Sequence, residues 1–328
     1  MGSQKSLRKS TPARVAATMT AMAALACPSC RPATEQTRAE QSPSSGCTTT
    51  GTWKKCKSMT QGAVFAGTVL GPDGHIYVIS GSTQYDVKLT AAVRVYRPDQ
   101  NAWAEVSPIP TPRTEPGAAA GSDGRIYVVG GSDKDHKKNV VEAYNPQTDT
   151  WARLTPMPTP RESLCAVAAK GADGRIRIYA IGGRDRSKPG NGLSTVEAYD
   201  PGADTWTAMA PMPTHRHGHA ATLGPDGCIY VLGGTNDKVF FTNVVEIFDP
   251  VKNSWTKGTP MPYGQECAAA TFTAGPDGEV LVFAGWDSRK RPIPSAVAFN
   301  PRTNLWRSLP PVPSARAAGG AVTLEGAD

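Results

Sequence analysis

Residues 229–262 read IYVLGGTNDKVFFTNVVEIFDPVKNSWTKGTPMP, and the same order of features recurs along the chain. A short apolar run ends in glycine. Further along, an aromatic residue stands two positions before a proline, and a tryptophan stands seven positions after that aromatic residue. The tryptophans lie about fifty residues apart, at Trp53, Trp103, Trp151, Trp206, Trp255 and Trp306. A period of this length predicts a repeat architecture in which each unit buries its faces against its neighbours.

Each unit is expected to form four strands. In the unit that begins near residue 218, a run of small residues at 218–223 precedes the turn Gly-Pro-Asp-Gly at 224–227. The apolar run 229–232 is typical of a strand that is covered on both faces. The aromatic strand near 244–248 and the tryptophan strand complete the unit. Because large side chains cannot converge on a crowded axis, we expect the small-residue strand to be innermost.

These motifs resemble the kelch repeat over roughly residues 53–328, with departures at Ser80-Gly81 and Ala284-Gly285, where one glycine of the pair is missing. The resemblance implies an all-β fold, a kelch-type β-propeller with one four-stranded blade per unit. The strand at Trp53 and a strand at 317–324 then predict a six-bladed architecture with one blade split between the termini. Either residues 1–52 supply its two middle strands or the given chain is incomplete, and the absence of repeat motifs in 1–52 favours incompleteness.

The segment 1–52 differs in composition from the propeller domain 53–328. Basic residues precede a weak apolar run at 15–26 and then Cys27, an order that resembles a bacterial export signal with a lipoprotein processing site. An N-myristoylation pattern at Gly2 and a basic tail without any targeting role are the alternatives. We therefore expect a protein that is exported or anchored to a membrane through its N-terminus, with a cytoplasmic location as the alternative. No apolar run approaches the eighteen residues of a spanning helix.

Four arginines share one register, a few residues after a proline-rich crossover. By the alternation of strand direction, this register is expected at the mouth of the central channel. These arginines resemble the ones with which kelch domains that recruit targets to ubiquitin ligases hold acidic peptides. Guanidinium groups bind carboxylates, sulfates and phosphates well. With the neighbouring Tyr263 and two histidines, the candidate binding residues are Arg113, Arg161, Arg216, Arg316, Tyr263, His215 and His217. On this interpretation the arginines contribute to binding, and replacing two of them should leave the fold intact.

We therefore interpret the chain as a non-enzymatic binding module that recognises an anionic protein, an acidic peptide or a glycan at the channel mouth. No catalytic residue, metal site or cofactor is predicted, and the net charge of +7 is not accompanied by aromatic–basic motifs typical of nucleic-acid binding. The alternative is a carbohydrate-active propeller enzyme. The kelch resemblance admits a galactose oxidase-like protein or a sialic acid mutarotase-like protein, and the latter needs only a glutamate and an arginine in the mouth, such as Glu162 or Glu266 beside Arg161 or Arg216.

Overall fold

The computed structural model describes the chain in ranges, and every structural statement below refers to them. They are residues 15–16, 48–50, 53–83, 88–133, 138–185, 187, 192–236, 241–266, 268–272 and 278–324. No helix that could cross a bilayer occurs in these ranges. The predicted export signal and lipid anchor lie on residues outside them, except for a two-residue strand at 15–16.

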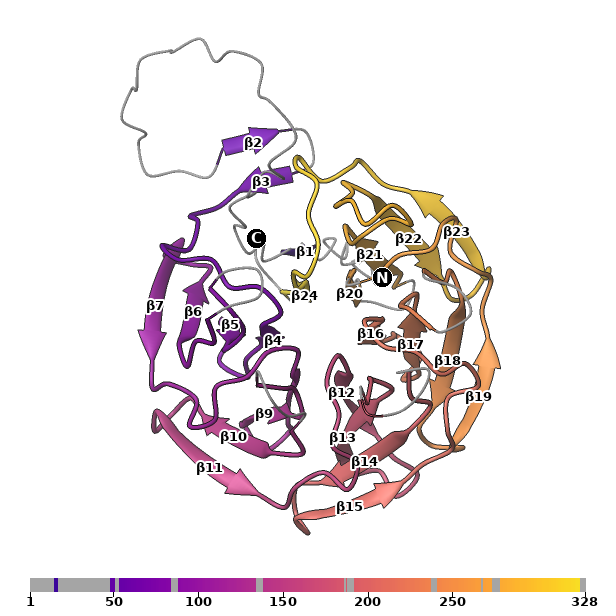
Figure 1. The fold of residues 1–328 in the computed structure, drawn as a ribbon. Helices are drawn as coiled ribbons and strands as arrows, with labels where there is room; N and C mark the ends of the chain where they lie inside the picture. The colour runs from indigo at the N-terminus through magenta and orange to yellow at the C-terminus, as the bar shows by residue number, and fades with distance from the viewer. Residues whose placement is uncertain are drawn as a thin grey trace, which may run out of the picture.

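Five four-stranded antiparallel sheets stand around a central axis, each with its first strand innermost and its fourth strand outermost (Figure 1). Blades 1 to 3 consist of β4 (Gly67–Leu70), β5 (Ile76–Ile79), β6 (Val93–Arg97) and β7 (Ala102–Val106); β8 (Gly117–Ala120), β9 (Ile126–Val129), β10 (Val141–Asn145) and β11 (Thr150–Leu154); and β12 (Cys165–Lys170), β13 (Ile176–Ile181), β14 (Val196–Asp200) and β15 (Thr205–Ala208). Blades 4 and 5 consist of β16 (Ala220–Leu223), β17 (Ile229–Leu232), β18 (Val245–Asp249) and β19 (Ser254–Lys257); and β20 (Ala269–Phe272), β21 (Val280–Phe283), β22 (Ala296–Asn300) and β23 (Leu305–Ser308). The all-β kelch propeller is confirmed.

The sector between blade 5 and blade 1 differs from the predicted sixth blade, because no four-stranded sheet forms there. The strand β24 (Val322–Thr323) lies between the inner strands β20 and β4. It pairs with β1 (Val15–Ala16), while β3 (Trp53–Lys55) pairs with β2 (Thr48–Thr50). The structure thus has five complete blades and two two-stranded sheets, and the N-terminal segment contributes two short strands that the sequence motifs did not predict. Pairing of this kind covers strand edges that would otherwise be open.

The tryptophans hold the outer ring together. The indole N–H of each of the six repeat tryptophans donates to a backbone carbonyl that follows the outer strand of the preceding sector, at 2.8–3.0 Å. The six bonds run from Trp53 to Pro310, Trp103 to Lys57, Trp151 to Ser107, Trp206 to Thr155, Trp255 to Ala210 and Trp306 to Thr259. Because Trp53 takes part through β3, the outer ring closes through all six sectors.

A second bond reinforces five of these six junctions. An Asn or Asp two residues before the tryptophan accepts from the backbone N–H of the same acceptor residue, as Asp149 does from Ser107 at 2.8 Å. The other pairs are Asn101 with Lys57, Asp204 with Thr155, Asn253 with Ala210 and Asn304 with Thr259. At the sixth junction Pro310 has no N–H to donate, and residue 51 is a glycine. The sequence therefore explains why the second hydrogen bond is missing at this one junction.

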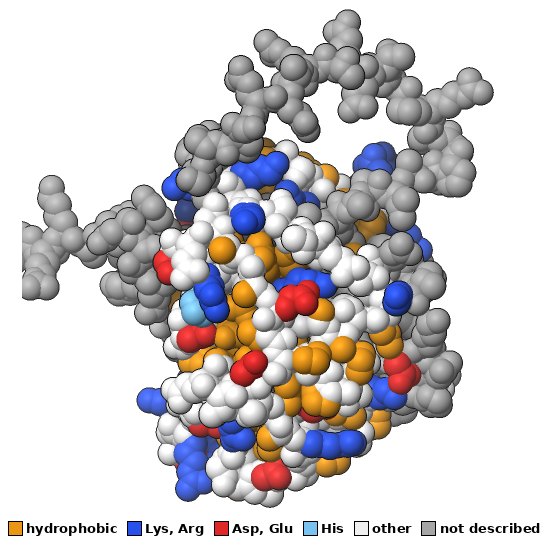
Figure 2. Space-filling view, turned by 90° about the vertical axis from the view of Figure 1, so that its left-hand side faces the viewer, with side chains coloured by type: hydrophobic (Ala, Val, Ile, Leu, Met, Phe, Trp, Pro, Cys, Tyr) orange, Lys and Arg blue, Asp and Glu red, His pale blue; other side chains and the backbone are white. Residues whose placement is uncertain are grey.

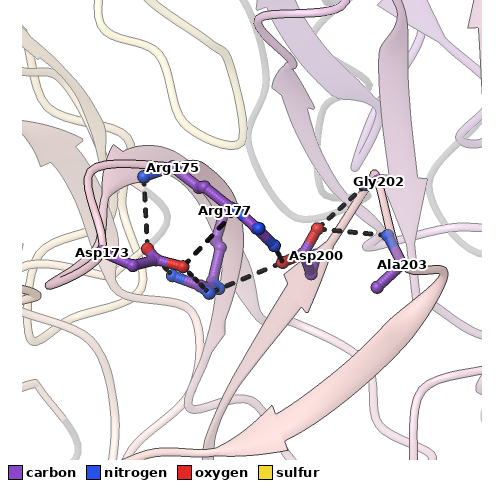
Figure 3. Close-up of polar contacts among 6 residues, drawn as sticks. All are labelled: Asp173, Arg175, Arg177, Asp200, Gly202 and Ala203. Carbon is purple, nitrogen blue, oxygen red and sulfur yellow. Dashed lines mark hydrogen bonds and ion pairs between the residues drawn. The ribbon is translucent and has the colours of Figure 1, made fainter.

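Blade 3 extends further than the others at the turn between its first two strands. In blades 1, 2 and 4 a tyrosine hydroxyl donates to the turn aspartate, as Tyr127 does to Asp123 at 2.7 Å. The strand β13 is two residues longer than its counterparts, and Arg177 takes over this role by contacting both oxygens of Asp173 at 2.7 Å. Figure 3 shows this pair together with Asp200, the next acceptor of the same arginine. The carboxylates at these turns thus have structural partners. On the side of the ring in Figure 2, acidic, basic and hydrophobic side chains are interspersed.

Candidate functional site at the channel mouth

Three of the four arginines that were expected at the channel mouth are instead buried within the blades. The side chains of Arg113, Arg161 and Arg216 have no exposed surface. Each forms an ion pair with a glutamate on the third strand of its own blade, and the pairs are Arg113–Glu142, Arg161–Glu197 and Arg216–Glu246. The prediction that these three arginines lie at the channel mouth is therefore wrong.

Blade 4 shows the arrangement in detail. Arg216 Nη2 lies 2.7 Å from one oxygen of Glu246, and the hydroxyl of Thr214 donates to the other oxygen at 2.7 Å. The guanidinium also donates to the carbonyl of Val244 at 3.0 Å. Burial lowers the pKa of Arg216 to about 10, so this arginine remains charged at neutral pH. A buried ion pair of this kind is tolerated only where hydrogen bonds satisfy the remaining donors and acceptors.

The buried arginine and its glutamate occur together in the complete blades: a blade has both of them or neither. In blade 5 the arginine register holds Gln265 and the glutamate register holds Val297. Gln265 Nε2 donates to Ser295 Oγ at 2.6 Å instead. In blade 1 the same two registers hold Ala63 and Arg94. Arginine at this register is therefore accompanied by glutamate in every complete blade that has it, which indicates a structural brace.

The remaining candidate residues lie in varied surroundings. Arg316 is half-buried, its Nε donates to Ser314 Oγ at 3.0 Å, and no ion pair to it occurs in the described ranges. Tyr263 is exposed at 38%, His215 is half-buried and His217 is buried. His217 Nδ1 lies 3.7 Å from a carboxylate oxygen of Glu266. The structure does not bring the seven candidates into one site.

The mouth is formed instead by residues that lie shortly before the innermost strands of blades 1 to 4 and before β24. These residues adopt left-handed backbone conformations with φ of 53–59°, and they line the channel: Phe65, Glu115, Ser163, Gly218 and Ala318. Backbone hydrogen bonds link them from blade to blade, since the N–H of Glu115 donates to Phe65 at 2.8 Å and that of Ser163 donates to Glu115 at 3.1 Å. Below this ring the channel wall consists mainly of the small residues of β4, β8, β12, β16 and β20.

An arginine that was not among the candidates carries the charge at this mouth. Arg184 Nη2 lies 3.0 Å from Glu115 and its Nε lies 2.6 Å from Glu162. Burial by itself would lower the pKa of Arg184, but the two carboxylates outweigh this effect and raise it. The Glu115 carboxylate also accepts from the hydroxyl of Ser163. Nearby, burial raises the pKa of Glu266. The sequence signal for Arg184 was its position directly after Gly182-Gly183.

The histidines next to this mouth give a prediction for stability. Burial and the nearby charge of Arg216 lower the pKa of His219 to about 3. An unfolded histidine titrates near 6.5, so the unfolded chain binds one more proton than the folded chain between about pH 3 and 6.5. The stability contributed by neutral His219 is complete above about pH 6.5 and is lost as the pH falls, by up to about 1.4 kcal/mol per pH unit. Urea unfolding of the wild type and His219→Gln between pH 7 and 5 measures this, and equal slopes would contradict it.

Within the described ranges, no group of three or more His, Cys, Asp or Glu side chains is arranged to hold a metal ion. His215, His217 and His219, which alternate along the chain, therefore do not form a metal centre with the neighbouring side chains in those ranges. The mouth is better described as a fixed set of hydrogen-bonding and charged groups on a rigid ring.

Comparison with known proteins agrees with this fold. The family model of the KLHDC2/KLHL20/DRC7 Kelch-repeats domain matches residues 65–274, and the Kelch motif matches residues 273–313. Beta-scruin of Limulus polyphemus is 42% identical over 62 residues, which are 19% of this chain and 6% of that protein. Human Kelch-like protein 34 is 41% identical over 58 residues, 18% of this chain and 9% of that protein. The matches thus span less than a tenth of either relative.

Among solved structures, the structure of YjhT is similar in fold. Its TM-score is 0.63 at 18% identity, and the alignment covers 79% of this chain and 87% of that chain. A likeness at this identity concerns the fold alone. The family model by itself covers most of the described blades and more than half of the sequence, and it shows that the chain belongs to the kelch-repeat family.

Proposed function

We propose that this chain is a non-enzymatic binding module that recognises a protein partner through the ring of residues at its channel mouth. The backbone at the mouth is held by blade-to-blade hydrogen bonds, so the ring presents its side chains from a defined backbone. Preorganised groups of this kind bind with a smaller loss of conformational entropy than mobile ones. Membership in the kelch family and the short matches to kelch-like proteins support the same function.

One observation carries this proposal, namely the contrast between two sets of left-handed residues. The set that reinforces the outer junctions is uniform, because each member is Asn or Asp: Asn101, Asp149, Asp204, Asn253 and Asn304. These two residue types tolerate the left-handed region best after glycine. The set at the mouth contains Phe, Glu, Ser, Gly and Ala, and most of these residue types pay a conformational cost there. A position whose backbone is constant while its side chain varies is suited to presenting side chains to a ligand.

The charge at the mouth limits the kind of partner. Three carboxylates, those of Glu115, Glu162 and Glu266, lie around the guanidinium of Arg184, and Lys290 adds one further positive charge near Glu266, so acidic groups exceed basic ones by one in this set. Such a mouth favours basic and hydrogen-bond-donating groups on the partner. The arginine register predicted an anionic partner, but the three buried arginines do not support this prediction. Basic residues of loops 134–137, 188–191 and 237–240 lie outside the described part of the chain.

The test is a comparison of two double variants. The partner is first captured on the immobilised chain, identified by mass spectrometry and purified, and its affinity is then measured by calorimetry. We expect Phe65→Ala/Glu115→Ala to weaken binding about tenfold or more, since central interface residues contribute about 2 kcal/mol. The matched control is Glu105→Ala/Val251→Ala, which removes one acidic and one hydrophobic side chain that are exposed elsewhere. Equal affinity of the two double variants would show that the mouth is not the recognition surface.

A second candidate function rests on the contacts of Arg184. A glutamate and an arginine in contact at a channel mouth meet the requirement stated for a mutarotase-like activity on sialic acid, although Arg184 rather than Arg161 or Arg216 would serve. Exchange between the anomers of sialic acid, followed by NMR, tests this candidate. Acceleration by the wild type and not by Arg184→Ala would favour it over the binding module.

A further inference from the structure

Beside the channel mouth, each complete blade has two residues that form an antiparallel bridge. One directly follows the arginine register, and the other directly follows the second glycine. The five pairs are Val64–Ser82, Thr114–Ser132, Glu162–Arg184, His217–Thr235 and Glu266–Trp286. Residues paired in this way lie directly opposite each other, and their side chains stand on the same face at close distance. Blades 3 and 5 therefore share a glutamate at this position but differ in the side chain beside it.

Blade 3 shows which contact a glutamate makes at this position. The N–H of Arg184 donates to the carbonyl of Glu162 at 2.8 Å, and its side-chain Nε lies 2.6 Å from the carboxylate of Glu162. In blade 5 the N–H of Trp286 donates to the carbonyl of Glu266 at 2.9 Å. The two backbones thus match, but blade 5 has an indole where blade 3 has a guanidinium.

The carboxylate of Glu266 lies against the mouth. A Cβ added to Gly218, one of the residues at the mouth, would lie 2.9 Å from Glu266 Oε1. The glutamate side chain is 24% exposed, and within the described ranges its ion-pair contact is with His217, with 3.7 Å between Nδ1 and Oε1. Arg184 and Lys290 act on this carboxylate from a longer distance. Glu266 can therefore accept a cation from a partner.

The backbone of Trp286 is held on both sides. It forms one bridge with Glu266 and a second with Pro292. The turn between these two bridges is capped by Asp287, whose carboxylate accepts from the backbone N–H groups of Arg289 and Arg291 at 2.9 Å. The indole is half-buried, so part of it is accessible beside the carboxylate. A guanidinium group stacks on aromatic rings and pairs with carboxylates, and this combination offers both contacts.

We propose that Glu266 and Trp286 form a subsite of the mouth that receives an arginine side chain of the protein partner. The guanidinium pairs with the carboxylate of Glu266 and stacks on the indole of Trp286. A lysine side chain fits less well, because its compact ammonium group provides neither a planar stack nor a bidentate contact. The excess of carboxylates at the mouth favours the same kind of group. This inference rests on the function proposed for the mouth and names the side chain that is recognised there.

The experiment uses the full chain and the probe peptide acetyl-Gly-Arg-Gly-amide. A second peptide carries citrulline in place of arginine, which keeps the shape of the side chain and removes its charge. NMR titration of the tryptophan indole N–H signals measures the binding of both peptides. We expect the arginine peptide to bind about fivefold more tightly or better, as for a charge-assisted hydrogen bond. Glu266→Gln should lower its affinity to about that of the citrulline peptide and should hardly affect the citrulline peptide. Trp286→Leu should weaken binding of the arginine peptide about threefold, as for a cation–π contact at an exposed site.

Glu105→Gln is the matched control, since it neutralises a glutamate that is 66% exposed on the outer strand β7. It should leave binding of both peptides unchanged. Equal binding of the two peptides, equal effects of Glu266→Gln and Glu105→Gln, or no binding of the arginine peptide at about 10 mM would overturn the subsite. None of these results involves the purified partner. The function proposed for the mouth fails separately, if that partner binds the two double variants described above with equal affinity.

Discussion

Replacing Arg216 by alanine is expected to lower the free energy of unfolding by about 3–5 kcal/mol, because the change leaves the carboxylate of Glu246 buried without its cation. Both side chains have no exposed surface, so water cannot take the place of the guanidinium. This is the opposite of the expectation from sequence, in which loss of two such arginines leaves the fold intact. Equilibrium unfolding in urea, followed by tryptophan fluorescence, measures the change.

The chain itself supplies a control for this prediction. Blade 5 has glutamine and valine where blade 4 has Arg216 and Glu246. The double variant Arg216→Gln/Glu246→Val removes both charges together, and replacing a buried pair by neutral groups is often close to neutral. We expect it to be clearly more stable than Arg216→Ala. A double variant that is less stable than the single variant would show that the arginine acts through its packing and its carbonyl contacts rather than through the ion pair.

Replacing Gly285 by alanine is expected to lower the free energy of unfolding by about 3 kcal/mol or more, from backbone strain and a close contact together. Gly285 has φ of 104°, and an added Cβ would lie 2.9 Å from the carbonyl oxygen of Glu266. The adjacent Ala284 has φ of 58°, in the left-handed region that other residues enter at moderate cost. The matched control Ala284→Gly should change stability by less than about 1 kcal/mol. Thermal unfolding measures the stability of both variants. Similar losses of stability for Gly285→Ala and Ala284→Gly would contradict this explanation.

This difference between neighbours explains which glycines the repeat retains. The first glycine of the pair is replaced by Ser80 in blade 1 and by Ala284 in blade 5, where φ is 59° and 58°. The second glycine is present in all five blades, with φ of 92–104°. The sequence recorded both departures from the pattern, but only the backbone angles show why the two positions differ.

The repeat period and its motifs were sufficient to predict the propeller, because each blade repeats the same strands, turns and tryptophan contacts. The closing sector was less predictable. Its short strands β1 and β2 lie in a segment that has none of the repeat motifs, and pairing of so few residues leaves no periodicity in the sequence.

The arginine register was correctly identified as a repeated position, but register alone does not fix the direction of a side chain. A signal was present in the third strands, where glutamate occurs in the blades that have the arginine and valine occurs in blade 5. Reading the two positions together would have predicted an ion pair rather than a free cation. Arg184 was missed for a different reason: its position holds Ser82, Ser132, Thr235 and Trp286 in other blades, so no repetition drew attention to it.

One arginine register has two kinds of surroundings in this propeller: buried ion pairs in blades 2 to 4, and in the closing sector Arg316, which donates to Ser314 and has no ion pair in the described ranges. Urea unfolding of four single alanine variants, at Arg113, Arg161, Arg216 and Arg316, tests this difference most directly. We expect losses of about 3–5 kcal/mol for the first three. For Arg316→Ala we expect a loss below about 1 kcal/mol, as is usual for a residue without a buried ion pair. Four losses of similar size, whether large or small, would contradict it.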